Sequence, residues 1–510
     1  MITIKTSGHS LANQEVEGYA LFCDDTFSFE NNKHLQEIAH KFYKPLADII
    51  KQRKFSGAAG SCLSVAGVDS NGNRPVYIIL VGLGSHKRKQ VDRLEQARRS
   101  AGTLIRTAEG LKIKTIALDF PDHHWFGVDE YVLAKEITAT MLMATYHFDQ
   151  FITDDSRKHN QDYTVTFCAP ELLHTRITIG AERGLHIGYA VNQARHWCDL
   201  PPCVLTPTNF AEHAIRISTA HNLKCTIFDE KTIIKMGMGG LAAVSQGSEQ
   251  ECRFVIMEYK TEHKDAPTIA LVGKGVTFDS GGLSIKPAAR MDEMKDDMAG
   301  AAAVISSMEM LAHLKPNVNV IGIAPITENL PSGTAIKPGD IVQFYNGKTA
   351  EIKNTDAEGR LILADALSYA VKHYQPDAII NFATLTGACS YALGPFFCGL
   401  MSKHDDLASK ISHASLRSGD RAWALPFHDD YKVAVRSSVA DICNIGNESY
   451  RAGSITAGFF LQNFVGETPW VHLDIAGTSF NVPDISYYRP GATGFGVRLI
   501  ADFIGNWESL

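Results

Sequence analysis

Strand-length apolar runs alternate with helix-length segments through the second half of this 510-residue chain, and the alternation limits the folds open to it. The segments are residues 269–273, 299–314, 318–325, 361–374 and 378–384. Strands that are apolar throughout are buried on both faces, which happens when helices cross over between parallel strands. We therefore predict an α/β fold whose larger C-terminal domain contains a mostly parallel sheet covered on both faces.

The first part of the chain has the pattern of a smaller α/β unit. Residues 76–81 form a β-branched and aromatic run typical of a buried strand, and residues 85–112 are rich in helical pattern. A further helix is expected at 177–198, because Pro201 and Pro202 disfavour its continuation. We therefore predict an N-terminal α/β domain at 1–175, a linking helix at 176–199 and a catalytic domain at 200–510.

Charge and composition narrow the surroundings in which the chain works. A formal net charge of −7 and a pI near 6.3 give no general attraction to nucleic acid or anionic lipid. The chain has no run of about 18 apolar residues, which a membrane-spanning helix requires. Its first residues lack the apolar segment of a secretory signal, and its ten cysteines include no C-x-x-C pair. We expect a cytoplasmic protein with reduced thiols and no membrane association.

Charged side chains gather where two of the expected strands end, which is where ligands bind in open α/β sheets. The charged residues are Lys274, Asp279, Lys286 and Asp297 after the strand at 269–273, and Asp356, Glu358 and Arg360 after a hairpin expected at Asn346-Gly347. Crowded carboxylates need compensating charge, which oxygen-bound divalent cations such as Mn²⁺, Mg²⁺ or Zn²⁺ provide. In extended backbone Asp356 and Glu358 would point to the same side. The pattern predicts a divalent-metal site.

Three other kinds of active site lack their sequence signatures. The chain has no H-E-x-x-H zinc helix and no G-x-S-x-G nucleophile elbow. Gly347-Lys348-Thr349 has the end of a phosphate-binding loop, but Val342 occupies the position of the first glycine of such a loop. A metal-assisted hydrolase is therefore favoured, and on chemistry alone a two-metal phosphatase stays open beside a peptidase.

Several motifs resemble those of the leucyl, or cytosol, aminopeptidase family of metallopeptidases. The segment NTDAEGRLILADAL at 354–367 looks like the family signature, and other motifs match the family in order and spacing. They are VGKGVTFDSGGLSIKP at 272–287, MDEMKDDMAGAAAV at 291–304, PSGTAIKPGD at 331–340, DICNIG at 441–446, HLDIAG at 472–477 and PGATGFGVRL at 490–499. The resemblance covers about residues 180–510 and is loose over the first 170 residues.

The resemblance assigns roles to seven charged residues and implies two divalent metal ions per chain, Mn²⁺ before Zn²⁺. The implied metal ligands are Lys274, Asp279, Asp297, Asp356 and Glu358, with Asp279 and Glu358 shared by both ions, and the implied catalytic pair is Lys286 and Arg360. Arg360 would hold a bicarbonate ion that acts as general base, the alternative being a helix-start arginine paired with a nearby acid. Lys274 can bind a metal only as a neutral amine, so we expect burial and the cations to lower its pKa.

The resemblance also implies peptide substrates, a homohexamer and a pocket for the first side chain of the substrate. The implied pocket residues are Met294, Thr384, Leu385, Gly387, Ala476 and Ser479. A largely apolar wall would favour leucine or another apolar residue. Ser479 stands where a larger apolar residue is frequent in the family, which broadens the expected preference. Core packing explains Met294 equally well.

A DNA-binding accessory role is the main alternative, because some bacterial relatives that this chain resembles bind DNA. It draws on a basic run between Lys87 and Lys114, although such runs usually form a solvated helix face and the net charge opposes the role. A catalytically inactive scaffold is disfavoured, since all seven charged positions are kept. The sequence therefore predicts a two-metal aminopeptidase of intracellular peptide turnover.

Overall fold

The computed structural model describes residues 1–68, 74–159 and 161–507 of the chain, which folds into two compact units. The first unit comprises residues 1–189 and 483–489, and the second comprises 190–482 and 490–510. The division falls inside helix α6 (His174–Asp199), within the stretch predicted as a linking helix. The sequence did not predict that residues 483–489 belong to the first unit. They are held there by contacts between residues far apart in the chain, such as the hydrogen bond from Arg106 Nη1 to Asp484 Oδ1 (2.7 Å).

The first unit is built on a six-stranded sheet with the strand order β1-β6-β5-β2-β4-β3. Neighbouring strands are parallel except β3, which pairs with β4 in the antiparallel direction. The strands are β1 (Ile2–Ser7), β2 (Gly18–Asp24), β3 (Cys62–Val68), β4 (Pro75–Gly84), β5 (Thr115–Asp119) and β6 (Tyr163–Cys168). The strand predicted at 76–81 is confirmed as part of β4, which is buried from Ile78 onwards.

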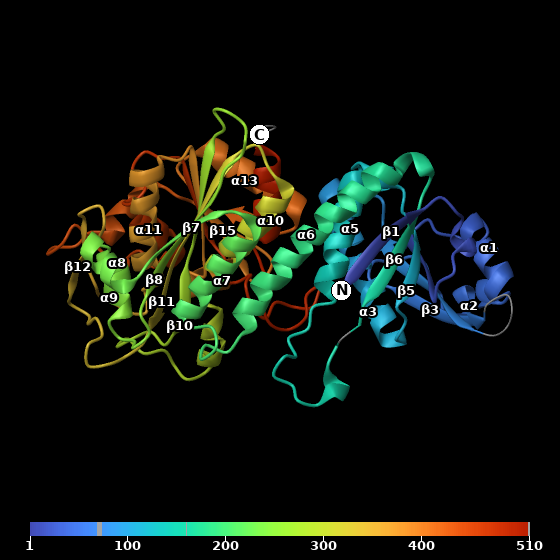
Figure 1. Ribbon diagram of the computed structural model, residues 1–510, viewed down its shortest axis with the longest axis horizontal. Helices are drawn as coiled ribbons and strands as arrows, with labels where there is room; N and C mark the ends of the chain where they lie inside the picture. The colour runs from blue at the N-terminus through green and yellow to red at the C-terminus, as the bar shows by residue number, and fades with distance from the viewer. Residues whose placement is uncertain (69–73, 160, 508–510) are drawn as a thin grey trace. The chain divides into compact units, whose positions relative to one another are not determined.

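Helices of the first unit flank this sheet (Figure 1). They are α1 (Lys33–Phe42), α2 (Leu46–Gln52), α3 (Gln90–Leu111), α4 (His123–Phe126), α5 (Glu130–Ala144) and the first part of α6. On α1 the residues Leu35, Ile38 and Phe42 recur at helical spacing, and this apolar face packs into a core with Tyr19 and Leu80 of the sheet. The smaller α/β unit predicted for this part of the chain is confirmed.

The basic run at 87–114 coincides largely with α3, and one of its basic side chains lies buried inside the first unit. Arg98 is only 1% exposed, and its Nε donates to Glu136 Oε2 at 2.8 Å. Arg99 Nε donates to Glu95 Oε1 at 3.0 Å on the same helix. Arg98 therefore joins α3 to α5 through a buried ion pair, which weakens the case for a DNA-binding surface on this helix.

The second unit contains a nine-stranded sheet in the order β16-β15-β18-β14-β9-β11-β8-β7, with β10 paired to β11 beside this path. The strands are β7 (Lys224–Phe228), β8 (Arg253–Tyr259), β9 (Thr268–Gly273), β10 (Gly275–Asp279), β11 (Asn319–Asn329), β14 (Ala378–Ala383), β15 (Cys398–Met401), β16 (Ala422–Ala424) and β18 (Trp470–Asp474). The central strands β18, β14, β9 and β11 run parallel, as predicted. Beyond this centre, β8 and β15 each join their inner neighbour in the antiparallel direction.

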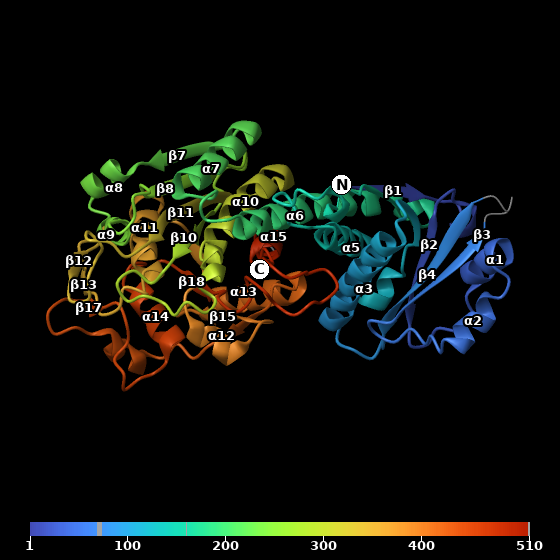
Figure 2. The same cartoon turned by 90° about the horizontal axis from the view of Figure 1, so that it is seen from below.

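Helices cover both faces of this sheet, with α10 and α11 on opposite sides of the strands (Figures 1 and 2). Besides the last part of α6, the helices of the unit are α7 (Pro207–His221), α8 (Glu230–Met236), α9 (Gly239–Ser245), α10 (Ala299–Leu314), α11 (Gly359–Tyr374), α12 (Gly387–Leu393), α13 (Asp405–Ser418), α14 (Gly453–Gln462) and α15 (Val497–Gly505). Both α10 and α11 pack against β9 and β11, which explains why these strands are apolar throughout. No described helix combines the length and apolarity needed to cross a bilayer.

The predicted Asn-Gly hairpin lies in a separate three-stranded sheet of β12 (Ile341–Gln343), β13 (Thr349–Glu351) and β17 (Ile442–Cys443). β12 and β13 are antiparallel, and Gly347 has the positive φ of 87° that the turn requires. The hairpin carries the chain towards Asp356 and Glu358, so it positions half of the predicted site.

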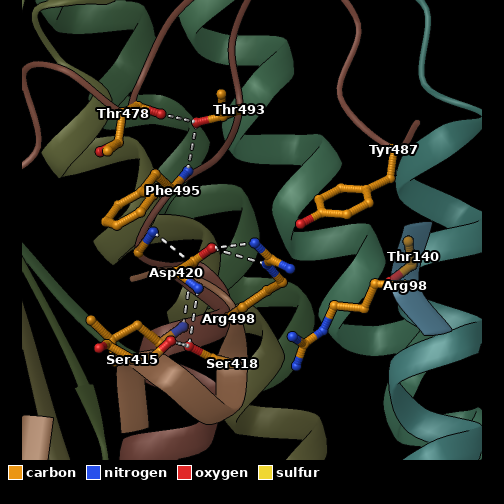
Figure 3. A network of polar contacts seen from close by, with 12 residues as sticks. Arg98, Thr140, Ser415, Ser418, Asp420, Thr478, Tyr487, Thr493, Phe495 and Arg498 are labelled. Carbon is orange, nitrogen blue, oxygen red and sulfur yellow. Dashed lines mark hydrogen bonds and ion pairs between the residues drawn. The ribbon is translucent and has the colours of Figure 1, made fainter. Parts of the chain in front are cut away.

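A buried ion pair joins Asp420 to Arg498 in the second unit (Figure 3). Asp420 Oδ1 accepts from Arg498 Nε at 2.9 Å and Nη2 at 2.6 Å. Its Oδ2 accepts from the backbone N–H of Gly496 at 2.9 Å and of Leu499 at 3.3 Å. Both oxygens of this fully buried carboxylate are therefore hydrogen-bonded, and it anchors the start of α15.

Candidate metal centre

Lys274 directly follows β9 and lies within a buried group of charges. Its Nζ lies 2.7 Å from Asp297 Oδ1 and 2.8 Å from Glu358 Oε1, and it donates to the carbonyl oxygen of Thr384 at 2.8 Å. Lys274 and Glu358 are each 2% exposed. Because β9 and β14 are parallel neighbours, their carboxyl ends bring Lys274 and Thr384 to the same edge of the sheet.

Lys286 joins the other two acids that the sequence singled out. Its Nζ lies 2.7 Å from Asp279 Oδ2 and 2.6 Å from Asp356 Oδ1. Asp279 Oδ1 accepts from Asn329 Nδ2 at 2.8 Å, which fixes this carboxylate at the end of β10. Carboxylate oxygens of Asp279, Asp356 and Glu358 lie within 4.8 Å of one another. The fold thus brings the five predicted ligands and Lys286 into one cluster.

Asp356 and Glu358 approach each other through a turn, so the extended backbone predicted for them is wrong. Residues 355–356 form the turn, and Asn354 Oδ1 accepts from the Asp356 N–H at 2.8 Å. Glu358 precedes α11 with helical angles, φ −79° and ψ −39°. The immediate start of α11 leaves no length for a straight strand, and the turn aims both carboxylates at the cluster.

Two glycines make room for the charged side chains. A Cβ at Gly359 would lie 2.4 Å from Lys274 Cε and 2.7 Å from its Nζ. The Lys274 side chain therefore fits beside the first turn of α11 only because residue 359 is a glycine. Gly281 has a φ of 88°, and a Cβ there would lie 2.8 Å from Asp356 Oδ1. The glycines of the two motifs are therefore parts of the site.

Burial and mutual repulsion shift the protonation of the cluster. Burial, with repulsion from Glu358, raises the pKa of Asp279 to about 6, and burial also raises the pKa of Asp297 well above its usual value. Burial alone would raise the pKa of Glu358, but Lys274 and Lys286 outweigh it and lower that pKa. Burial likewise opposes the charge on Lys274, yet the surrounding carboxylates raise its pKa. In the protein alone the pKa of Lys274 is thus raised, not lowered as expected. It would fall only if cations bound the carboxylates that now stabilise the ammonium.

The cluster carries more negative charge than its lysines neutralise. Four carboxylates and two lysines leave a formal surplus of two negative charges, four minus two. Asp297 Oδ2 is buried and has no hydrogen-bond partner among the described residues. Buried anions are costly unless they are paired or bind a metal. The donor set, four carboxylates and one amine, fits divalent cations.

Arg360 lies on the first turn of α11 and is 7% exposed. Its Nη1 donates to the carbonyl oxygen of Asn444 at 2.6 Å, whereas its Nε is buried without a hydrogen-bond partner among the described residues. Burial lowers the pKa of the guanidinium to about 10. No ion pair to an acid holds Arg360 within the described part of the chain, so the alternative of a simple helix-start ion pair is not what its contacts show.

The residues predicted to line a substrate pocket come from three segments. Thr384, Leu385 and Gly387 follow β14, Ala476 and Ser479 follow β18, and Met294 lies on a short 3₁₀ helix, η4 (Met291–Asp296). Thr384 Oγ1 donates to Asp297 Oδ1 at 2.8 Å, which ties this segment to the cluster. Ser479 Oγ donates to Asp296 Oδ2 at 2.8 Å, and burial raises the pKa of Asp296 to about 7.

Several supporting residues escaped the sequence prediction. Asn329 holds Asp279, and Asn444 holds Arg360. Asp474 Oδ2 accepts from Thr386 Oγ1 at 2.6 Å and so shapes the loop after β14. Asn444 and Asp474 lie inside the family-like motifs at 441–446 and 472–477, whereas Asn329 reaches the site only through the pairing of β10 with β11.

An α/β sheet with a buried cluster of carboxylates and lysines at its carboxyl edge is the site of a metal-dependent hydrolase. Comparison with known proteins names the family. The model of the cytosol aminopeptidase family matches its catalytic domain to residues 192–501 and its N-terminal domain to residues 21–155. This chain therefore belongs to the cytosol aminopeptidase family and is a metallo-aminopeptidase.

Individual relatives agree with the family assignment. A probable cytosol aminopeptidase of Chlorobaculum tepidum is 42% identical over 468 residues, covering 89% of this chain and 91% of the relative. One from Cenarchaeum symbiosum is 41% identical over 468 residues, covering 90% and 92%. Among solved structures, a mutant of tomato leucine aminopeptidase matches with a TM-score of 0.86 and 29% identity, covering 99% of this chain and 97% of that one. The bottromycin maturation enzyme BotP in complex with Mn matches with a TM-score of 0.83 and 30% identity, covering 96% and 99%.

Proposed function

We propose that this enzyme removes N-terminal residues from peptides with two divalent cations held by Lys274, Asp279, Asp297, Asp356 and Glu358. The observation that carries the proposal is the surplus of buried carboxylate over lysine around Lys274. Mn²⁺ is our first choice and Zn²⁺ our second, because four oxygen donors and one amine suit both ions and a solved structure of similar fold contains Mn. When bound, such cations activate a water molecule as nucleophile and polarise the scissile carbonyl.

Lys286 is proposed to stabilise the oxyanion that develops on the substrate carbonyl. Its ammonium pairs with Asp279 and Asp356 in the protein alone, so cations that occupy these carboxylates would leave its N–H groups available to substrate. Burial opposes this charge, but Asp279, Glu358 and Asp297 outweigh it and raise the pKa of Lys286, so the side chain stays charged. A donor of this kind contributes about 3 kcal/mol, roughly a hundredfold in rate.

Arg360 is proposed to hold a bicarbonate ion, which by the family resemblance serves as general base. Nη1 of the guanidinium donates to the carbonyl oxygen of Asn444, whereas its buried Nε has no hydrogen-bond partner in the described chain. The guanidinium therefore has donors available for a planar anion. Its lowered pKa of about 10 still leaves it fully charged near neutrality.

The first side chain of the substrate is proposed to enter a pocket between η4 and the segments after β14 and β18. Met294, Leu385 and Ala476 offer an apolar wall, which favours leucine and other apolar side chains. By the family resemblance we further propose a role in intracellular peptide turnover, a cytoplasmic location and a homohexameric assembly.

The test of this function is hydrolysis of leucine p-nitroanilide by protein stripped of metal and resupplied with Mn²⁺ or Zn²⁺. We expect no hydrolysis after stripping and recovery on adding either ion. Glu358→Ala should stay inactive at every metal concentration, whereas the exposed Asp406→Ala should behave like wild type. Hydrolysis that survives complete chelation would overturn the proposal.

A further inference from the structure

The buried carboxylate of Asp296, which is not among the five predicted metal ligands, contacts Ser479, one of the residues proposed to line the pocket for the first side chain. Asp296 is 8% exposed, and its Oδ2 accepts from the Ser479 hydroxyl at 2.8 Å. Its second oxygen, Oδ1, is buried and has no hydrogen-bond partner among the described residues. No lysine or arginine of the described chain forms an ion pair with it. A buried acid in this state needs a donor that the protein itself does not provide.

The bond between Ser479 and Asp296 connects two walls of the pocket. Ser479 lies on the turn after β18 that also carries Ala476, and its N–H bonds to the carbonyl oxygen of Ile475 at 3.2 Å. Asp296 ends η4, two residues after Met294. The two walls therefore meet at a polar contact, although the remainder of the proposed pocket is largely apolar.

This contact presents an acceptor of negative potential. The Ser479 hydroxyl gives its hydrogen to Asp296, so only its lone pairs remain for another group. The carboxylates of Asp199 and Glu293 add to the negative potential at Asp296, and the ammonium of Lys274, which is held by Asp297 and Glu358, partly offsets it. The neighbouring ammonium of Lys295 is directed elsewhere, since it donates to the carbonyl oxygen of Asp199 at 2.9 Å.

We propose that Ser479 and Asp296 select substrates whose first residue carries a cationic side chain, lysine or arginine, in addition to apolar first residues. This inference rests on the proposed function, because it concerns the substrate of the same site. The methylene stem of a lysine can lie along the apolar wall while its ammonium reaches the acceptors. An apolar side chain of equal length leaves those acceptors without a donor.

The test compares lysine and norleucine p-nitroanilides, whose first side chains differ chiefly by the ammonium group. We measure kcat/KM for both with Mn²⁺-loaded wild type, Asp296→Asn, Ser479→Ala and the exposed control Asp292→Asn. Asp296→Asn should lower the ratio of lysine to norleucine by roughly 10- to 100-fold, the range of a charged hydrogen bond, and Ser479→Ala should lower it about tenfold. Asp292→Asn should leave the ratio as in wild type.

The outcomes separate this inference from the proposed function. An unchanged ratio in Asp296→Asn, or an equal fall for both substrates, overturns the selection of cationic residues while norleucine hydrolysis upholds the peptidase. Wild type that hydrolyses neither anilide with any metal overturns both. If Asp296→Asn does not fold, the ratio in Ser479→Ala decides, because loss of one hydroxyl leaves the carboxylate in place.

Discussion

Two buried groups of charged side chains in the second unit differ in their net charge, which is zero in one and negative in the other. Around Asp420, one carboxylate meets one guanidinium and two backbone N–H groups, so each of its oxygens has partners. Around Lys274, four carboxylates share two lysines, and Asp297 Oδ2 has no hydrogen-bond partner among the described residues. In the first arrangement the chain alone satisfies both oxygens of the carboxylate and balances its charge. The second is complete only when cations join it, which separates a structural ion pair from a metal centre.

The same contrast separates acids by the direction of their pKa shifts. Glu109 of the first unit pairs with Arg489 and His147, which outweigh burial and lower its pKa to about 2. Asp279 of the metal centre has a pKa raised to about 6. A paired acid is stabilised in its charged form by the fold, whereas a surplus acid is destabilised in that form until a cation arrives.

The largest effect should come from breaking the complete pair. Asp420→Asn leaves the buried Arg498 without its counter-charge, so we expect a loss of about 3–5 kcal/mol in the free energy of unfolding. Folded Asp420→Asn protein should keep the wild-type kcat on leucine p-nitroanilide, since Asp420 has no part in the metal centre. Denaturant unfolding and active-site-normalised kinetics measure both quantities, and a loss of kcat without a loss of stability would contradict the assignment.

An intermediate effect concerns stabilisation by metal. Each of the two proposed sites, at a free Mn²⁺ concentration 100 times its dissociation constant, should stabilise the wild type by about 2.7 kcal/mol. Asp356→Asn removes one surplus acid, so the metal-free variant should be at least as stable as metal-free wild type. Its gain on adding Mn²⁺ should fall below half of the wild-type gain, as calorimetry with and without the ion would show.

Asp420→Asn serves as the matched control for this experiment. It should lose stability in both states while keeping the full gain on adding Mn²⁺. An equal metal gain in wild type and Asp356→Asn would remove Asp356 from the ligands.

The smallest effect is a pH dependence in the first unit. Because the fold lowers the pKa of Glu109 from 4.5 to about 2, its stabilising contribution is complete above pH 4.5 and disappears as the pH falls towards 2. Glu109→Gln should therefore cost about 1–2 kcal/mol at pH 7 after allowance for solvent screening, and this cost should shrink steadily below pH 4.5. Unfolding of both proteins at pH 7, 4.5 and 3 measures it; a cost that stays constant with pH would contradict the ion pair.

Much of the second unit follows from its sequence because buried parallel strands are apolar throughout. The helix predicted at 299–314 is α10, and the strand predicted at 269–273 is β9 with one residue added. The edge strand β7 escaped prediction for a related reason. β7 is only partly buried along its length, so its sequence lacks the apolar run that marks a central strand.

The site was predictable to the extent that its parts lie in contiguous motifs. Lys274, Asp279, Asp356 and Glu358 were named from motifs, and the fold brings them together. The sequence does not show which residues far apart in the chain form hydrogen bonds in the folded protein. The bond of Asp296 to Ser479 spans 183 residues, and no local pattern distinguishes Asp296 from the acids beside it.

The most direct test of the account is anomalous diffraction at the Mn edge from crystals soaked in Mn²⁺. We predict two peaks among Lys274, Asp279, Asp297, Asp356 and Glu358, and the loss of at least one peak in Glu358→Ala. Active enzyme whose crystals show no peak there, with Lys274 still paired to Asp297 and Glu358, would contradict the claim that surplus acid marks the metal centre.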